Sequence, residues 1–241
     1  MSPDPTSAAQ PLRDPREQWY SPYRGLPIGL SFKWLLGGAA LYALLLLVAI
    51  AGNPGEAAWP IVGPNLYLTP VFGAPYVFGT LNRPGRTRRI FYFLALLPLL
   101  HMAANYAACY YALATYDPFD PAGQYFRNLA TGAIGGGAGA LLGFAGLHLM
   151  RLTSRPRVEM AMMALGIVAL AAIGAATMAR GLAWTAAFEH RDDAERVIVW
   201  YETVHAPWQA AFALFLAWLM RPARGARSRE TSQGIDGVKA G

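Results

Sequence analysis

Ionisable side chains are rare inside the long apolar segments of this chain, and they are few enough to name. His101 lies near the middle of one segment, His148 near the end of the next, and Glu202 and His205 share a third. Titratable groups are costly in an apolar environment, so those found there commonly bind ions, move protons or fix helix packing. His101, Glu202 and His205 are therefore the first candidates for function, whereas His148, close to Arg151, is interpreted as an interfacial side chain.

Helical spacing places more polar side chains beside these three. Residues at i, i+4 and i+8 share a face of the segment that holds His101, and a second polar face begins at Glu202. If the two segments are antiparallel helices that rise about 1.5 Å per residue, Gln209 lies level with His101 and His205 lies near Asn105. We call this predicted pairing the polar seam. Its members are His101, Asn105, Cys109, Glu202, His205 and Gln209.

The polar seam has four interpretations. It could be structural, with side chains that hydrogen-bond to each other and fix helix pairing. It could line a transport pathway, because Glu202 and His205 can exchange protons and nearby prolines can break helices. It could hold haem b between two axial imidazoles, His101 and His205, or it could be an enzyme site for a lipid-soluble substrate. Tyr201 and Trp208 are close enough to line it.

The favoured class is non-catalytic: a small transporter-like protein, or an accessory subunit of a membrane complex. The alternative is a membrane enzyme or redox subunit that uses His101, Glu202 and His205. The Glu202-x-x-His205 spacing matches the motif that di-iron bundles use twice, but it occurs once here, so no metal site is predicted from one chain. Bound cofactors are not predicted, and haem b is the minority alternative.

One short stretch bears on the enzyme alternative. The run Glu189–Asp192, followed by His205–Pro207, resembles the end of the sterol-isomerase (emopamil-binding) family. That resemblance implies an isomerase with an upstream histidine, here His101. The match is confined to residues 189–207, and Asn105 stands where the family pattern has a glutamate four residues after that histidine.

The apolar segments that carry these residues indicate an all-α, polytopic membrane protein. Of the 241 residues, 55% are hydrophobic and 14% are charged, against about 25% charged in soluble domains. A helix needs about 20 apolar residues to cross the hydrocarbon. The sequence predicts about six spans, at 32–50, 61–81, 90–113, 129–150, 160–182 and 197–220.

The second predicted span is the least regular, because it contains Pro64, Pro70 and Pro75, and it could be continuous or broken. Charge favours a crossing there. With six spans and a cytoplasmic N-terminus, nearly all Lys and Arg residues fall on the cytoplasmic side, as the positive-inside rule requires. The exceptions are Arg127, Arg180, Arg191 and Arg196. This pattern predicts a bacterial inner-membrane protein with both termini in the cytoplasm.

The fourth predicted span is rich in glycine at four-residue spacing, which lets two helix backbones approach closely. The predicted packing residues are Gly132, Gly135, Gly136, Gly139 and Gly143. The fifth span, which contains Gly166 and Gly174, is the expected partner within the chain. Contact between protomers or with another membrane protein is the alternative.

The remaining features complete the expected organisation. Residues 1–30 are predicted to be a cytoplasmic N-terminal tail, residues 31–220 the transmembrane domain, and residues 221–241 a disordered cytoplasmic tail. The single cysteine, Cys109, excludes a disulfide within the chain. The net charge of +6 is attributed to topology and to anionic headgroups, so the lipid bilayer is the expected partner and nucleic acid is not.

Overall fold

The structure is a computed structural model, and it describes residues 25–52, 63–153, 156–186, 198 and 201–222. Most of both predicted tails lies outside these residues, as do Glu189, His190 and Asp192. Every element among the described residues is helical, so the all-α fold class is confirmed. The elements are α2 (Ile28–Gly52), α3 (Gly63–Phe78), α4 (Arg86–Phe91), the π-helix η3 (Tyr92–Leu96), α5 (Leu97–Ala114), α6 (Pro121–Leu149), α7 (Pro156–Ala186), the π-helix η4 (Tyr201–His205) and α9 (Ala206–Leu219).

Four helical stretches are long and apolar enough to cross a membrane: Ile28–Ala49, Arg86–Ala114, Ala122–Leu149 and Glu159–Gly181. The chain is thus a multi-pass membrane protein by the length and composition of its helices. Each of the six predicted spans overlaps a helix of the structure. The prolines of α3 do not interrupt it, but with 16 residues it is about 24 Å long, short of the hydrocarbon thickness of about 30 Å.

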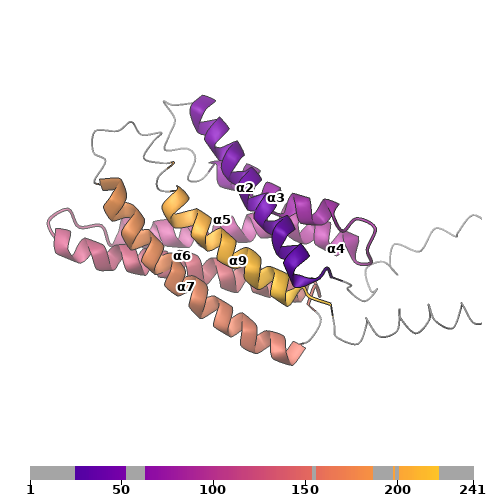
Figure 1. The fold of residues 1–241 in the computed structure, drawn as a ribbon. Helices are drawn as coiled ribbons and strands as arrows, with labels where there is room; N and C mark the ends of the chain where they lie inside the picture. Colours follow the sequence, from indigo (N-terminus) through magenta and orange to yellow (C-terminus); the bar gives the residue numbers. More distant parts are fainter. Residues whose placement is uncertain (1–24, 53–62, 154–155, 187–197, 199–200, 223–241) are drawn as a thin grey trace, which may run out of the picture.

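The helices form one bundle, in which α2 and α3 run in opposite directions, as do α6 and α7 (Figure 1). α2 packs on α3 and α9, and α6 packs on α7 and α5. One end of the bundle gathers basic residues, and we call it the basic end. There Arg83 donates to the carbonyl of Gly25 at 3.3 Å and Arg88 donates to that of Arg151 at 3.3 Å, while the guanidinium of Arg221 lies 3.5 Å from the centre of the Trp218 ring.

Arg89 ties together the turn between α3 and α4 at the basic end. Its side chain is almost fully buried, and it donates to the carbonyls of Pro84 at 2.7 Å, Thr80 at 2.7 Å and Arg83 at 2.8 Å. A buried guanidinium is tolerated when its donors are satisfied. The turn carbonyls that follow α3 thereby gain a donor from the next helix.

At the opposite end, the start of α6 is capped by Asp120. The carboxylate of Asp120 accepts the N–H of Gly123 at 2.9 Å and pairs with Arg127 at 3.1 Å. The hydrogen bond from Gly123, together with Arg127, holds the pKa of the Asp120 carboxyl below its usual range. Arg127 is one of the few cations predicted to lie away from the basic side, and here it lies at the end opposite the basic loops.

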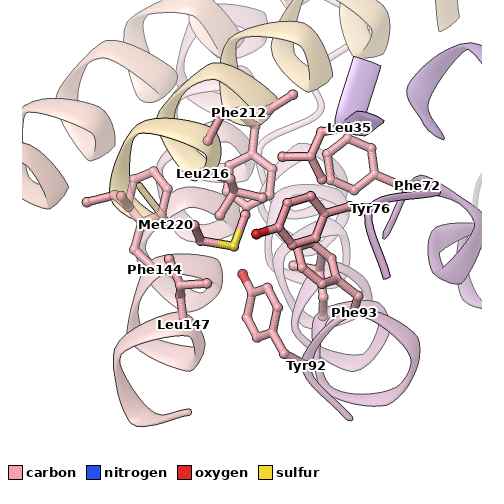
Figure 2. Packing of buried hydrophobic residues seen from close by; sticks show 14 of the residues in the cluster. Leu35, Phe72, Tyr76, Tyr92, Phe93, Phe144, Leu147, Phe212, Leu216 and Met220 are labelled. Carbon is pink, nitrogen blue, oxygen red and sulfur yellow. The ribbon is translucent and has the colours of Figure 1, made fainter. Parts of the chain in front are cut away.

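The buried core near the basic end is built from aromatic and aliphatic side chains of nearly every helix (Figure 2). Tyr92 donates to the carbonyl of Gly143 at 2.9 Å, which links η3 to α6. Phe212 of α9 stacks on Phe144 of α6 with ring centres 5.6 Å apart. Figure 2 shows Tyr76 and Tyr92 pointing their hydroxyls toward Met220. This core fixes α9 against α6 and α3.

Glycines make the closest contacts between helices. A Cβ at Gly132 would overlap the carbonyl oxygen of Gly174, and one at Gly174 would overlap that of Gly132, so α6 and α7 touch backbone to backbone. Gly136 lies equally close to the carbonyl of Leu170. α2 and α3 cross in the same way, because a Cβ at Gly38 would overlap the carbonyl of Phe72.

The crossing of α2 and α3 gives a matched test, because Gly37 and Gly38 are neighbours in one helix and nothing lies within 4 Å of a Cβ at Gly37. We predict that Gly38→Ala destabilises the protein by about 1–3 kcal/mol through overpacking. Gly37→Ala should leave stability unchanged or raise it by roughly 0.5–1 kcal/mol, since alanine favours the helix. Thermal unfolding of the detergent-purified variants measures the difference; equal melting temperatures would contradict the crossing at Phe72.

Candidate functional site

A proline sets the backbone around each of the two histidines of the polar seam. Proline has no N–H, and its ring collides with the carbonyl four residues earlier. For Pro98 that carbonyl belongs to Leu94, at the centre of η3, and for Pro207 it belongs to Thr203, at the centre of η4. The wider π turn relieves the collision without breaking the helix. The prolines thus produce π turns instead of the breaks that a transport pathway would use.

These turns bring side chains of α5 and η4 face to face. The ring centres of His101 and His205 are 6.3 Å apart, and those of His101 and Trp208 are 6.4 Å apart. Tyr201 stacks on His205 from the other side, with centres 5.9 Å apart, and Tyr42 of α2 stacks on Tyr201 at 5.7 Å. A row of rings therefore crosses the bundle from α2 to α5.

A cavity of about 230 Å³ lies beside this row, between α5, α6, α7 and η4–α9. Helix α5 contributes His101, Asn105 and Cys109, and His205 lines the cavity from η4. The wall from α6 consists largely of glycine, so little side chain projects into the space. Three of the helical stretches able to cross a membrane contribute to the cavity wall.

Three residues that line the cavity each have a buried polar atom without a hydrogen-bond partner. The atoms are His101 Nε2, Asn105 Nδ2 and Trp208 Nε1. An unpaired buried polar group costs about 1–3 kcal/mol, so native proteins keep few of them. Three such residues on one cavity make it the candidate binding site.

The indole of Trp208 is held in a fixed orientation. Its ring is stacked on Phe212 with centres 4.8 Å apart and planes 16° apart. On its other side it lies against α6, where a Cβ at Gly139 would stand 3.0 Å from the indole Cζ2 and one at Gly136 would stand 3.1 Å from Nε1. The glycines therefore let the ring lie close to the helix, with its N–H beside Gly136, a residue of the cavity wall.

A second, smaller cavity of about 20 Å³ lies on the side of His101 that faces α2 and α3. Gln209 lines it together with His101 and Trp208. The amide oxygen of Gln209 accepts the hydroxyl of Tyr201 at 2.9 Å. Gln209 is thus a partner in the buried row of rings and lies on the opposite side of His101 from the larger cavity.

The structure does not gather all six residues of the predicted polar seam. His101, Asn105, Cys109 and His205 line the larger cavity, and Gln209 lines the smaller one. Glu202 is exposed on the outside of η4 and lines neither cavity. A π turn takes more residues per turn than an α-helix, so a spacing of three does not bring Glu202 onto the face of His205.

The predicted packing glycines face two directions. Gly132 and Gly136 lie against α7. Gly135 faces Ala108, where a Cβ would stand 3.1 Å away, and Gly139 and Gly143 face the rings of Trp208 and Phe212. All five therefore contact residues of the same chain.

Two further residues of the cavity wall were not predicted from the sequence. Asn128 and Thr131 of α6 line the cavity, and Asn128 accepts the side-chain amide of Gln124 at 2.9 Å. Their positions near the start of a glycine-rich helix do not reveal which face turns inward. Tyr42 of α2 also joins the row of rings, and an isolated tyrosine in an apolar segment gives no such signal.

The donor set limits the cofactors that this site could hold. Among the described residues, no group of three or more His, Cys, Asp and Glu side chains lies close enough to hold a metal ion. The 6.3 Å separation of the His101 and His205 ring centres matches two imidazoles on one metal ion, but the cavity of about 230 Å³ is smaller than a haem group. His148 is exposed near the basic end, away from both cavities.

Comparison with known proteins adds no relative to these observations. No family model, no curated protein and no solved structure matches the chain.

Proposed function

We propose that the chain is a six-span bacterial inner-membrane protein whose bundle binds a small lipid-soluble molecule, in the manner of a transporter-like protein or an accessory subunit of a membrane complex. The observation that carries this proposal is the cavity of about 230 Å³ with unpaired polar atoms on its wall. Sites for small molecules are mostly apolar hollows with a few convergent polar groups, and helix bundles commonly form them between helices.

The basic end supports the proposed orientation. The α3–α4 turn, the α6–α7 connection and the end of α9 meet there, and all three carry arginine. Cytoplasmic loops of membrane proteins carry an excess of Lys and Arg. A bundle with the basic end in the cytoplasm adds α3 and η4–α9 to the four candidate spans as two further crossings and leaves both termini inside.

The size of the cavity supports a small ligand. Pockets for drug-sized molecules span about 300–1,000 Å³, and an apolar cavity of roughly 150 Å³ holds benzene. The present cavity lies between these values and suits one substituted ring or a molecule of that size. The glycines of α6 are used in contacts within the chain, so a partner subunit or a second copy would bind through another surface.

Orientation is tested with reporters inserted in three connections. We predict that alkaline phosphatase fused after Pro84 or Thr153 is inactive, since both positions belong to the cytoplasmic side. A fusion after Phe119 should be active, since it lies at the opposite end. Active phosphatase after Pro84 would contradict the crossing of α3 and with it the six-span arrangement.

Binding in the cavity is tested with Cys109, the single cysteine, which lines the cavity. We predict that toluene slows alkylation of Cys109 by N-ethylmaleimide in the detergent-purified protein, because it occupies the space beside the thiol. Ala112→Phe, which fills the same cavity, should remove the effect of toluene. The control is Ala114→Phe, whose position is exposed. An equal effect of toluene on both variants would place the interaction outside the cavity.

Haem b between His101 and His205 is a second candidate, favoured by the 6.3 Å separation of the two rings. Its chemistry would make the chain a redox subunit. If this candidate is correct, the purified protein has a Soret band that disappears in His101→Ala and in His205→Ala. His148→Ala is the matched control and should keep the band. A flat oxidised-minus-reduced spectrum of the wild-type protein removes this candidate and leaves small-molecule binding.

A further inference from the structure

We propose that the ligand of the larger cavity is a neutral, ring-sized molecule that carries a carbonyl oxygen, of the quinone or cyclic-ketone class. The inference rests on the proposed binding function and specifies its chemistry. Its basis is the kind of polar atom that the cavity wall leaves without a partner.

The unpaired atoms are predominantly hydrogen-bond donors. Trp208 Nε1 and the Nδ2 of Asn105 can only donate, and His101 Nε2 can donate or accept according to its tautomer. Trp208, which is 8% exposed, lines the cavity from α9, and Asn105 lines it from α5. A ligand can hydrogen-bond to both of these side chains only if it carries a hydrogen-bond acceptor.

Charge narrows the choice further. Among the residues that line the cavity there is no Lys, Arg, Asp or Glu, and Glu202 and Arg180 are exposed elsewhere. A cationic ligand would bring further hydrogen-bond donors to the cavity and find no carboxylate to accept them. An anionic ligand would lose its hydration without a cation to pair with. The acceptor therefore belongs to a neutral molecule. A carbonyl oxygen accepts hydrogen bonds and has no proton of its own to donate, so it fits this wall better than an amine.

The rigid setting of Trp208 makes it the anchor. Its ring is fixed between Phe212 and the glycines of α6, so the N–H keeps its direction before any ligand arrives. A donor that is already oriented loses little freedom on binding. The remaining wall, of alanine, glycine and Met178, contacts the apolar part of the ligand.

The experiment compares two probes of one shape, duroquinone and durene, which are tetramethyl-substituted rings with and without carbonyl oxygens. The four methyl groups of duroquinone block addition of thiols to the ring, so Cys109 serves as the reporter. Protection of Cys109 from N-ethylmaleimide is titrated with each probe in the detergent-purified full chain. We expect duroquinone to bind roughly 5- to 10-fold more tightly than durene, the factor of one neutral hydrogen bond.

The variant that isolates the donor is Trp208→Phe, which keeps an aromatic ring and removes the N–H. It should lower the affinity for duroquinone to that for durene and leave durene unchanged. Trp218→Phe, in the same helix but away from the cavity, is the control, and Asn105→Leu serves as a second test if Trp208→Phe fails to fold. Equal protection by both probes in the wild-type protein overturns the carbonyl inference and keeps the proposed binding function. No protection by either probe overturns both.

Discussion

The contact between the backbones of α6 and α7 at Gly132 and Gly174 is the constraint on which the rest of the bundle depends. Helices in lipid gain little from burying apolar surface, so close backbone approach and packing must hold them together. Because one face of α6 is fixed against α7, its other face meets α5 and α9. That face also carries glycine, so it accepts the ring of Trp208 and leaves a space where side chains would otherwise project. One run of small residues therefore explains both the close contact with α7 and the cavity beside Trp208.

The two prolines near the histidines act in the same way on different helices. Each stands two residues after the end of a π turn, and each π turn is centred on the carbonyl that the proline ring would otherwise strike. The turn widens the helix and rotates the residues on its C-terminal side. His101 and His205 consequently face each other, although α5 and α9 pack mainly on other helices. π turns are often found at functional sites, which agrees with their position beside the cavity.

The sequence predicted the helical fold and the face of α5, because its hydrophobic segments are long and α5 is a regular α-helix after Leu97. His101, Asn105 and Cys109 therefore share one wall, as their spacing indicates. The position of Glu202 was predicted from α-helical spacing, which does not apply there because the chain forms a π turn. Asn128 and Thr131 could not be assigned, since their orientation depends on how α6 rests on α7. Register changes and helix rotation are tertiary effects, and single-sequence periodicity does not contain them.

The turn tied by Arg89 has a consequence for how the chain enters the bilayer during synthesis. Helix α3 is short, contains three prolines and falls below the length of the four candidate spans. The turn that follows α3 is held by hydrogen bonds from Arg89, a residue of the next helix. A ribosome that has just completed α3 has therefore made a segment that is poorly suited to stay in lipid alone. In the proposed six-span arrangement, stable insertion of α3 has to wait until Arg89 and the apolar stretch behind it have emerged, so the two helices would enter as a hairpin.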